Sequence, residues 1–285
     1  MARAGVQALM LKEIVAEVGV FEAMRRMTET GFSVTEVSQI PMTAENVAGL
    51  VRARDELGVE IAAISAGLAP MAGGNDALST DFAKIVDDAH ALGTSMLRVA
   101  MLPLGALTDR GQLLDAAALL EDYAERLKAE GLRLIYHNHH VEFARFEGEF
   151  IHDILARTAP SVGFELDVHW LQRAGLDPAD AIAERAGRVA LIHMKDYRVK
   201  PLAPEALDSI AQGDMAAFWE AFLGTISDAE VGEGNLNWSR IIPASLDAGA
   251  EYLIVEQEQL TGLDVLECLR TSHRNIATLG FGALL

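Results

Sequence analysis

Three histidines and a glutamate lie close together in one apolar segment, "LIYHNHHVEF". They are His137, His139, His140 and Glu142, and the whole chain has only eight histidines. Imidazoles and carboxylates bind metals and act as general acids and bases, but a single histidine at the end of a strand is also commonly a hydrogen-bonded core residue. The segment therefore either lines a reactive site or pairs its polar groups inside a core.

Three later apolar segments end in the same residue types. These residues are Glu165, Asp167 and His169 in "ELDVHW", His193, Lys195 and Asp196 in "IHMKD", and Glu256 and Glu258 in "VEQEQ". Side chains alternate along a strand, so residues two apart share a face. Carboxylates that point into one cavity repel each other unless protons or a cation neutralise them. Two or three carboxylates with one imidazole suit Mn²⁺, Mg²⁺ or Co²⁺, so we expect a divalent metal site.

Some of these residues have a plainer interpretation. Glu165 precedes Asp167 inside an apolar run and is equally well explained as a buried structural partner. Lys195 and Asp196 can pair with each other or with neighbours, and Trp170 can serve as a wall or as core. The convergence of four consecutive segments is harder to explain in this way.

Eight short β-type segments alternate with amphipathic helical stretches along the whole chain, which favours a parallel sheet covered by helices. The segments are 5–11, 32–38, 59–65, 95–101, 132–138, 162–168, 189–195 and 251–257. In one helical stretch between them, Thr43 is a candidate N-cap followed by Asn46, and Gly58 is a candidate terminator.

Eight β/α units predict a closed (β/α)8 barrel of the triosephosphate isomerase type, as a single domain over residues 1–285. The alternative is an open doubly wound sheet, but no glycine-rich phosphate loop follows the first segment. Residues 201–238 exceed one crossover connection, so we expect an extended loop or helical insertion there, over the barrel mouth. Active sites of such barrels lie at the carboxyl ends of the strands, where the polar residues fall.

Composition narrows the possible partners and the compartment. The formal charge is −19, from 42 acidic and 23 basic residues, and no basic patch stands out. Such a field repels nucleic acids and anionic membranes, so we expect neither as a partner. A single cysteine, Cys268, rules out an internal disulfide, and the N-terminal apolar run is too short to span a bilayer. These features predict a cytoplasmic protein.

The segments "YHNHHVEF", "ELDVHW", "IHMKDY", "VGEGNLNW" and "YLIVEQEQ" resemble the xylose isomerase-like barrel superfamily, which includes sugar phosphate isomerases and epimerases. The resemblance covers nearly the whole chain in motif order. It implies a metal held by a Glu-Asp-His-Glu set, with Mn²⁺ expected first and Mg²⁺, Co²⁺ or Zn²⁺ as alternatives. The implied ligands are Glu142, Asp167, His193 and Glu256, with His137 as the alternative to Glu142.

The same resemblance implies a sugar isomerase or epimerase that removes a carbon-bound proton from a ketose or related keto-sugar through a metal-stabilised enediolate. Glu142 and Glu256 are the expected acid/base pair, His137 or His139 the alternative bases, and Lys195 a contact for a substrate oxygen. The expected substrate-binding residues are His169, Trp170, Glu258 and Glu165. A homo-oligomer is expected from the habits of the family.

Three other functions remain open at this stage. The first is a lyase on a keto-sugar, either an inosose dehydratase or an enzyme that eliminates the aglycone of a 3-keto-glycoside, some of which work with a small partner subunit. The second is hydrolysis at abasic DNA, which the acidic charge opposes. The third is a sugar-binding barrel without activity, although the ligand set looks intact.

Overall fold

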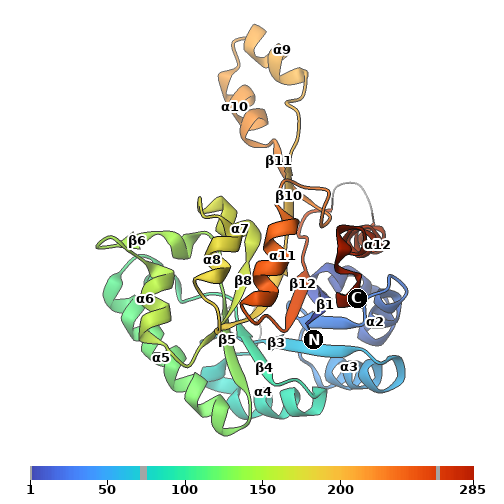
Figure 1. Ribbon diagram of the computed structural model, residues 1–285, viewed down its shortest axis with the longest axis vertical. Coiled ribbons are helices and arrows are strands. Elements are labelled where there is room, and N and C mark those ends of the chain that lie inside the picture. Colours follow the sequence, from blue (N-terminus) through green and yellow to red (C-terminus); the bar gives the residue numbers. More distant parts are fainter. Residues whose placement is uncertain (1, 71–75, 261–263) are drawn as a thin grey trace.

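Eight parallel strands close into a barrel in the order β1-β12-β9-β8-β5-β4-β3-β2 (Figure 1). The structure is a computed structural model, and it describes residues 2–70, 76–260 and 264–285. The barrel strands are β1 (Arg3–Gln7), β2 (Val34–Val37), β3 (Glu60–Ser65), β4 (Met96–Val99), β5 (Arg133–His137), β8 (Gly163–Asp167), β9 (Val189–Met194) and β12 (Tyr252–Val255). Each overlaps one of the eight predicted segments, so the predicted (β/α)8 barrel is confirmed.

The first strand ends earlier than predicted, at Gln7. The second half of the predicted segment, "ALML", forms a 3-10 helix, η1 (Ala8–Leu11), instead of strand. The Gln7 side chain accepts a hydrogen bond from the Leu9 backbone N–H at 3.2 Å and so caps this turn. Pairing of β1 with both neighbouring strands also ends by Gln7. An apolar run can therefore continue past its strand as a buried turn.

Helices surround the barrel and shield its outer face (Figure 1). They are α1 (Lys12–Val18), α2 (Val20–Thr28), α3 (Ala44–Leu57), α4 (Leu78–Leu92), α5 (Arg110–Ala129), α6 (Ile151–Thr158), α7 (Val168–Arg173), α8 (Pro178–Ala183), α11 (Trp238–Asp247) and α12 (Val265–Ile276). At α3 the Thr43 side chain accepts from the Asn46 N–H, and Gly58 ends the helix at φ +72°, as predicted. Within the described ranges, no helix is long and apolar enough to cross a membrane.

The barrel interior has an apolar layer beneath a polar one. Buried apolar side chains such as Val34, Met96, Ile135, Leu191 and Ile254 form one cluster. Two residues further along the same strands stand, in that order, Glu36, Arg98, His137, His193 and Glu256, all of them buried. Because side chains two apart share a face, the polar set lies above the apolar cluster, toward the carboxyl ends of the strands.

An arm leaves the barrel after β9 and returns before α11. It consists of an antiparallel ribbon, β10 (Asp196–Val199) and β11 (Ile226–Ala229), that carries α9 (Glu205–Ala211) and α10 (Met215–Leu223). The two helices project away from the barrel, whereas the sequence led us to expect an insertion lying over the mouth (Figure 1). The reason is the straight ribbon, whose four registered pairs carry the chain outward before it can turn.

Asp196 fixes the base of the arm. Its buried carboxylate accepts five hydrogen bonds, which come from the backbone N–H groups of Tyr197, Gly232, Gly234 and Leu236 and from Trp238 Nε1 at 2.7 Å. A Cβ at Gly234 would meet this carboxylate at 2.1 Å, so the loop can approach only because that residue is glycine. The segment "VGEGNLNW" is therefore a clamp on Asp196.

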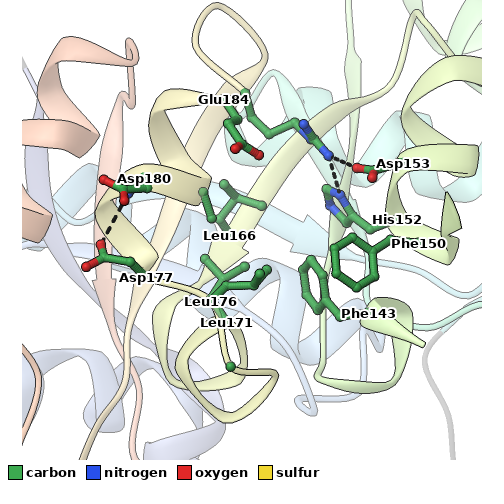
Figure 2. A pocket seen from close by; sticks show the side chains of 13 residues that line it. Phe143, Phe150, His152, Asp153, Leu166, Leu171, Leu176, Asp177, Asp180 and Glu184 are labelled. Atoms are coloured by element: carbon green, nitrogen blue, oxygen red, sulfur yellow. Dashed lines mark hydrogen bonds and ion pairs between the residues drawn. The ribbon is translucent and has the colours of Figure 1, made fainter. Parts of the chain in front are cut away.

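A cavity of about 310 Å³ lies in the outer layer, between α6, α7 and α8 (Figure 2). Phe143, Phe150, Leu166 and Leu171 are among its lining residues. Leu166 lies between Glu165 and Asp167 in β8, so its side chain points out of the barrel while theirs point in. The cavity is therefore separate from the polar set in the barrel interior.

His152 lines this cavity and is buried between aromatic rings. Its ring stacks on Phe143 at 5.3 Å and lies 4.7 Å from Phe164, and Arg185 Nη2 lies 3.5 Å from its Nδ1. Burial, together with the charges of Arg185 and Arg188, lowers the pKa of His152 from 6.5 to about 3. The side chain is therefore neutral in the folded protein over most of the pH range.

The pKa of His152 predicts an acid-sensitive fold. Because protonation favours the unfolded chain, the stabilisation is complete above the unfolded-state pKa of 6.5 and is lost as pH falls toward 3. The variant His152→Gln should escape this loss, which amounts to about 2–3 kcal/mol near pH 4.5. Urea unfolding between about pH 7 and 4.5 measures it. His90→Gln, at an exposed histidine, is the control and should follow the wild type, and equal slopes for all three proteins would contradict the prediction.

The clamp at Asp196 gives a second prediction. Asp196→Ala leaves several buried donors without a partner and should lower the free energy of unfolding by about 3 kcal/mol. The matched control Asp208→Ala, at an exposed aspartate of α9, should stay within about 0.5 kcal/mol of the wild type. Chemical denaturation measures both variants. Equal stability of Asp196→Ala and the wild type would show that the clamp does not hold the arm.

Candidate active site at the barrel mouth

The polar layer is organised around the imidazole of His193, at the end of β9. On one side, His193 Nε2 lies 2.8 Å from Glu36 Oε2 and 3.0 Å from Glu165 Oε1. On the other, His193 Nδ1 lies 2.9 Å from Glu256 Oε2 and 3.8 Å from Asp167 Oδ2. Four carboxylates, all at most 3% exposed, thus surround one imidazole.

Positive charge within this cluster is insufficient. Arg98 forms ion pairs with Glu36 and Glu165, and Lys195 Nζ lies 3.0 Å from Glu256 Oε1. Besides His193 itself, only Arg98 and Lys195, within the part of the chain that the structure describes, bring positive charge to the four carboxylates that surround His193. Burial alone would lower the pKa of His193, but the charges of Glu165, Glu256 and Glu36 raise it well above its usual value. The cluster strongly attracts a further cation.

Each of three predicted ligands has one atom held by the protein and one that faces the other ligands. Asp167 Oδ1 accepts from the Trp170 N–H at 3.1 Å, because Asp167 caps α7. Glu256 Oε1 accepts from Lys195, and His193 Nε2 contacts Glu36. The remaining atoms, Asp167 Oδ2, Glu256 Oε2 and His193 Nδ1, are buried and face one another without a hydrogen bond of good geometry. This arrangement suits a metal ion, because second-sphere bonds orient ligands whose other atom is free.

His137, from the opening segment, joins the same group. Ligand atoms of His137, Asp167 and His193 lie within 4.8 Å of one another. The rings of His137 and His193 are 4.7 Å apart, and the buried His137 Nδ1 lies 3.2 Å from Glu165 Oε2. Burial, and next the charge of Arg98, lower the pKa of His137 well below its usual value, which leaves the neutral form that binds metals.

Glu142, the expected first ligand, is placed elsewhere. Its Oε1 accepts from Tyr136 Oη at 2.7 Å and its Oε2 from the His139 backbone N–H at 2.8 Å. Both carboxylate oxygens therefore already accept hydrogen bonds. Glu142 itself lies in the short turn η3 (Val141–Phe143). Burial raises the pKa of Glu142. Neither group of convergent ligand atoms in the described chain includes it.

The sequence reasoning missed two residues of the cluster, Glu36 on β2 and Arg98 on β4. Glu36, Glu165 and His193 form a second convergent group, deeper in the barrel. Gln7 Nε2 donates to Glu36 Oε1 at 2.8 Å, and Arg98 Nη1 lies 3.2 Å from Ser38 Oγ. The available signal was one charged residue inside each apolar run, "FSVTEVS" and "SMLRVAM". A charge within a barrel strand is an indicator of an internal polar network.

Aromatic side chains gather beside the ligand group. The ring of Trp170 lies 4.7 Å from His169, 5.0 Å from His140 and 5.7 Å from His139, and Lys195 Nζ is 5.0 Å above the indole. Trp170 Nε1, His139 Nδ1 and His169 Nδ1 are buried without hydrogen-bond partners. Burial, and next the charges of Arg98 and Lys195 respectively, lower the pKa values of His139 and His169 to about 4.

The residues expected to bind substrate lie in three places. His169 and Trp170 belong to the aromatic group. Glu165 is buried beneath His193, and Arg98 contacts it there. Glu258 lies at the edge, where its half-exposed carboxylate pairs with Lys195 at 2.9 Å. The structure brings these residues together around Lys195 and His193, and Glu142 contacts Tyr136 and His139 beside them.

Comparisons with known proteins agree with the barrel fold. A family model described as "Xylose isomerase-like TIM barrel" matches residues 14–271. A sugar phosphate isomerase/epimerase from Parabacteroides distasonis has a similar structure, with a TM-score of 0.73, 19% identity and coverage of 99% of each chain. An L-ribulose 3-epimerase gives a TM-score of 0.66 at 17% identity, covering 100% of this chain and 96% of its own.

A third similar structure is that of a protein named for a different activity. It is the probable 3-DHS dehydratase AsbF from Bacillus anthracis, with a TM-score of 0.65, 15% identity and coverage of 98% of this chain and 99% of its own. At these identities the structural likeness establishes the fold alone, and no curated protein matches the chain. The family match spans nearly the whole chain, so this protein belongs to the xylose isomerase-like TIM barrel family.

Proposed function

We propose that this protein is a divalent-metal-dependent isomerase or epimerase that removes a proton next to the carbonyl of a ketose or related keto-sugar. The observation that carries the proposal is the buried group of His137, Asp167 and His193, whose ligand atoms lie within 4.8 Å of one another, with Glu256 Oε2 2.9 Å from His193 Nδ1. The residues fit Mn²⁺, Mg²⁺, Co²⁺ or Zn²⁺, which share oxygen and imidazole ligands. Mn²⁺ is our first choice.

A bound metal would supply Lewis-acid stabilisation of negative charge that develops on the substrate oxygens. The protein residues account for the rest of the chemistry. His139 is neutral at physiological pH, and its unpartnered Nδ1 can accept a proton from substrate carbon. Lys195 stays protonated between Glu256 and Glu258 and can donate a hydrogen bond to a substrate oxygen. Trp170 offers an aromatic face to the apolar side of a sugar ring.

Glu142 takes a positioning role in this scheme. Its carboxylate binds the backbone N–H of His139 and the hydroxyl of Tyr136, so it fixes the turn on which the proposed base stands. His137, at the end of β5, takes the ligand position. This assignment revises the ligand set expected from the sequence, in which Glu142 was the metal ligand and a catalytic base.

Metal content tests the ligand set. Asp167→Ala and His193→Ala should each weaken Mn²⁺ binding by more than about 100-fold, because they remove a direct ligand. Titration calorimetry and elemental analysis measure this without any assay of activity. His140→Ala, at an exposed histidine beside Trp170, is the matched control and should keep wild-type affinity. Full metal content in either ligand variant would overturn the site.

A second pair of variants separates His137 from Glu142. His137→Ala should lose the metal, whereas Glu142→Gln should bind it within about 10-fold of the wild type and lose turnover through misplacement of His139. Metal titration and steady-state kinetics on both variants decide the matter. Loss of metal in Glu142→Gln together with retention in His137→Ala would restore Glu142 as the ligand.

Proton exchange tests the reaction. The Mn²⁺-loaded protein is incubated in D₂O with ketoses, inososes and 3-keto-glycosides, and carbon-bound hydrogen is followed by NMR. We expect exchange accompanied by a new sugar isomer or epimer. Exchange with loss of water or of an aglycone would instead establish a lyase, the activity class of one structurally similar protein. No exchange with any substrate, with metal bound, would contradict both.

A further inference from the structure

The arm exposes an unusual amount of apolar surface. Of the large hydrophobic side chains exposed in the described residues, eight lie between 199 and 226. They are Val199, Leu207, Ile210, Met215, Trp219, Phe222, Leu223 and Ile226, with exposed fractions from 41% to 71%. Apolar patches of this kind mark interaction surfaces in proteins that remain folded and soluble.

The helix α10 carries most of this surface. The structure describes all of its residues, and none of them is buried. Met215, Trp219, Phe222 and Leu223 follow helical spacing and share one face. Glu220, the single charged residue of "MAAFWEAFL", falls outside this stripe by the same spacing. Within the described residues, α10 packs only against α9, and this apolar stripe stays open to solvent.

The arm presents this stripe in a defined position. Its ribbon has four registered pairs, Asn235 Oδ1 accepts from the Val199 N–H at 2.9 Å, and the Asp196 clamp anchors the base. The two helices pack against each other at the far end (Figure 1). A fixed pair of helices with one open apolar face is half of a four-helix arrangement.

The exposed area matches what a stable dimer needs. Large apolar and aromatic side chains bury on the order of 150–250 Å² each, so eight of them at about half exposure offer on the order of 800 Å². A standard interface buries about 800 Å² on each partner. The arm can therefore supply most of one side of such an interface.

We propose that the arm is a homodimerisation element, in which the α9–α10 pair of one copy packs on that of a second copy. A twofold interface brings the same patch of each copy together, so an apolar stripe is complementary to itself. The carboxylates of Glu205 and Asp208 lie on the face of α9 opposite Leu207 and Ile210 by helical spacing, so they stay outside the contact. Because the ribbon starts one residue after Lys195, the dimer would also brace the side of the mouth that holds this lysine.

The negative charge of the chain predicts how self-association depends on salt. Two copies, each with a formal charge of −19, repel each other while their apolar faces attract. Added salt screens the repulsion, so self-association should tighten as ionic strength rises. A basic partner protein bound to the same acidic arm would show the opposite dependence, and the chain alone would stay monomeric.

Sedimentation equilibrium of the full chain tests the proposal. The wild type should have twice the 30.7 kDa mass of the chain at micromolar concentration, and its dissociation constant should fall severalfold from low to moderate NaCl. The variant Trp219→Glu/Phe222→Glu should be monomeric. Leu119→Glu, at a residue of α5 that is 40% exposed outside the arm, is the matched control and should dimerise like the wild type.

Circular dichroism and metal binding verify that the variants are folded. Trp219 and Phe222 are both about half exposed. The variant Trp219→Glu/Phe222→Glu should therefore unfold at a temperature close to that of the dissociated wild type. A wild type that stays monomeric at every concentration and salt level overturns the proposal. So does a dimer that survives Trp219→Glu/Phe222→Glu, since it would use another surface.

Discussion

Four carboxylates buried around one imidazole are the constraint on which the rest of the site depends. A buried carboxylate is costly unless charge or hydrogen bonds compensate it, and His193, Arg98 and Lys195 together offer only part of what Glu36, Glu165, Asp167 and Glu256 require. The barrel provides the frame, because only a closed sheet directs residues from five strands or strand ends toward one axis. The apolar layer beneath then excludes water from below. The remaining negative potential favours a cation at the mouth, where substrate enters.

The role of each residue in the polar layer follows from which of its side-chain atoms already contact other protein groups. Glu36 and Glu165 hold the inner nitrogen of His193, so its outer nitrogen faces Glu256 and Asp167. Lys195 and the amino end of α7 do the same for Glu256 and Asp167. Each ligand is thus oriented before anything binds, which reduces the entropy cost of assembling a coordination sphere. Glu142 differs from the proposed ligands, because both of its carboxylate oxygens already accept hydrogen bonds.

The sequence predicted the barrel, and alternation in the late strands predicted that residues such as Asp167 and His193 share one face. It did not predict that Glu36 and Arg98 share that space. Their strands are early in the chain, and only barrel closure with its register brings β2 and β4 opposite β9. The choice between His137 and Glu142 depends on a three-residue turn that periodicity does not encode. The direction of the arm likewise depends on ribbon pairing between residues far apart in sequence.

The most direct test of the central claim is the position of a metal in crystals grown with Mn²⁺, located by its anomalous scattering. Our account predicts one peak within bonding distance of Asp167 Oδ2, His193 Nδ1 and Glu256 Oε2, with the His137 imidazole as a further ligand. A peak between Glu36 and Glu165, or one beside Glu142, would contradict the account, as would crystals without an anomalous peak in the barrel.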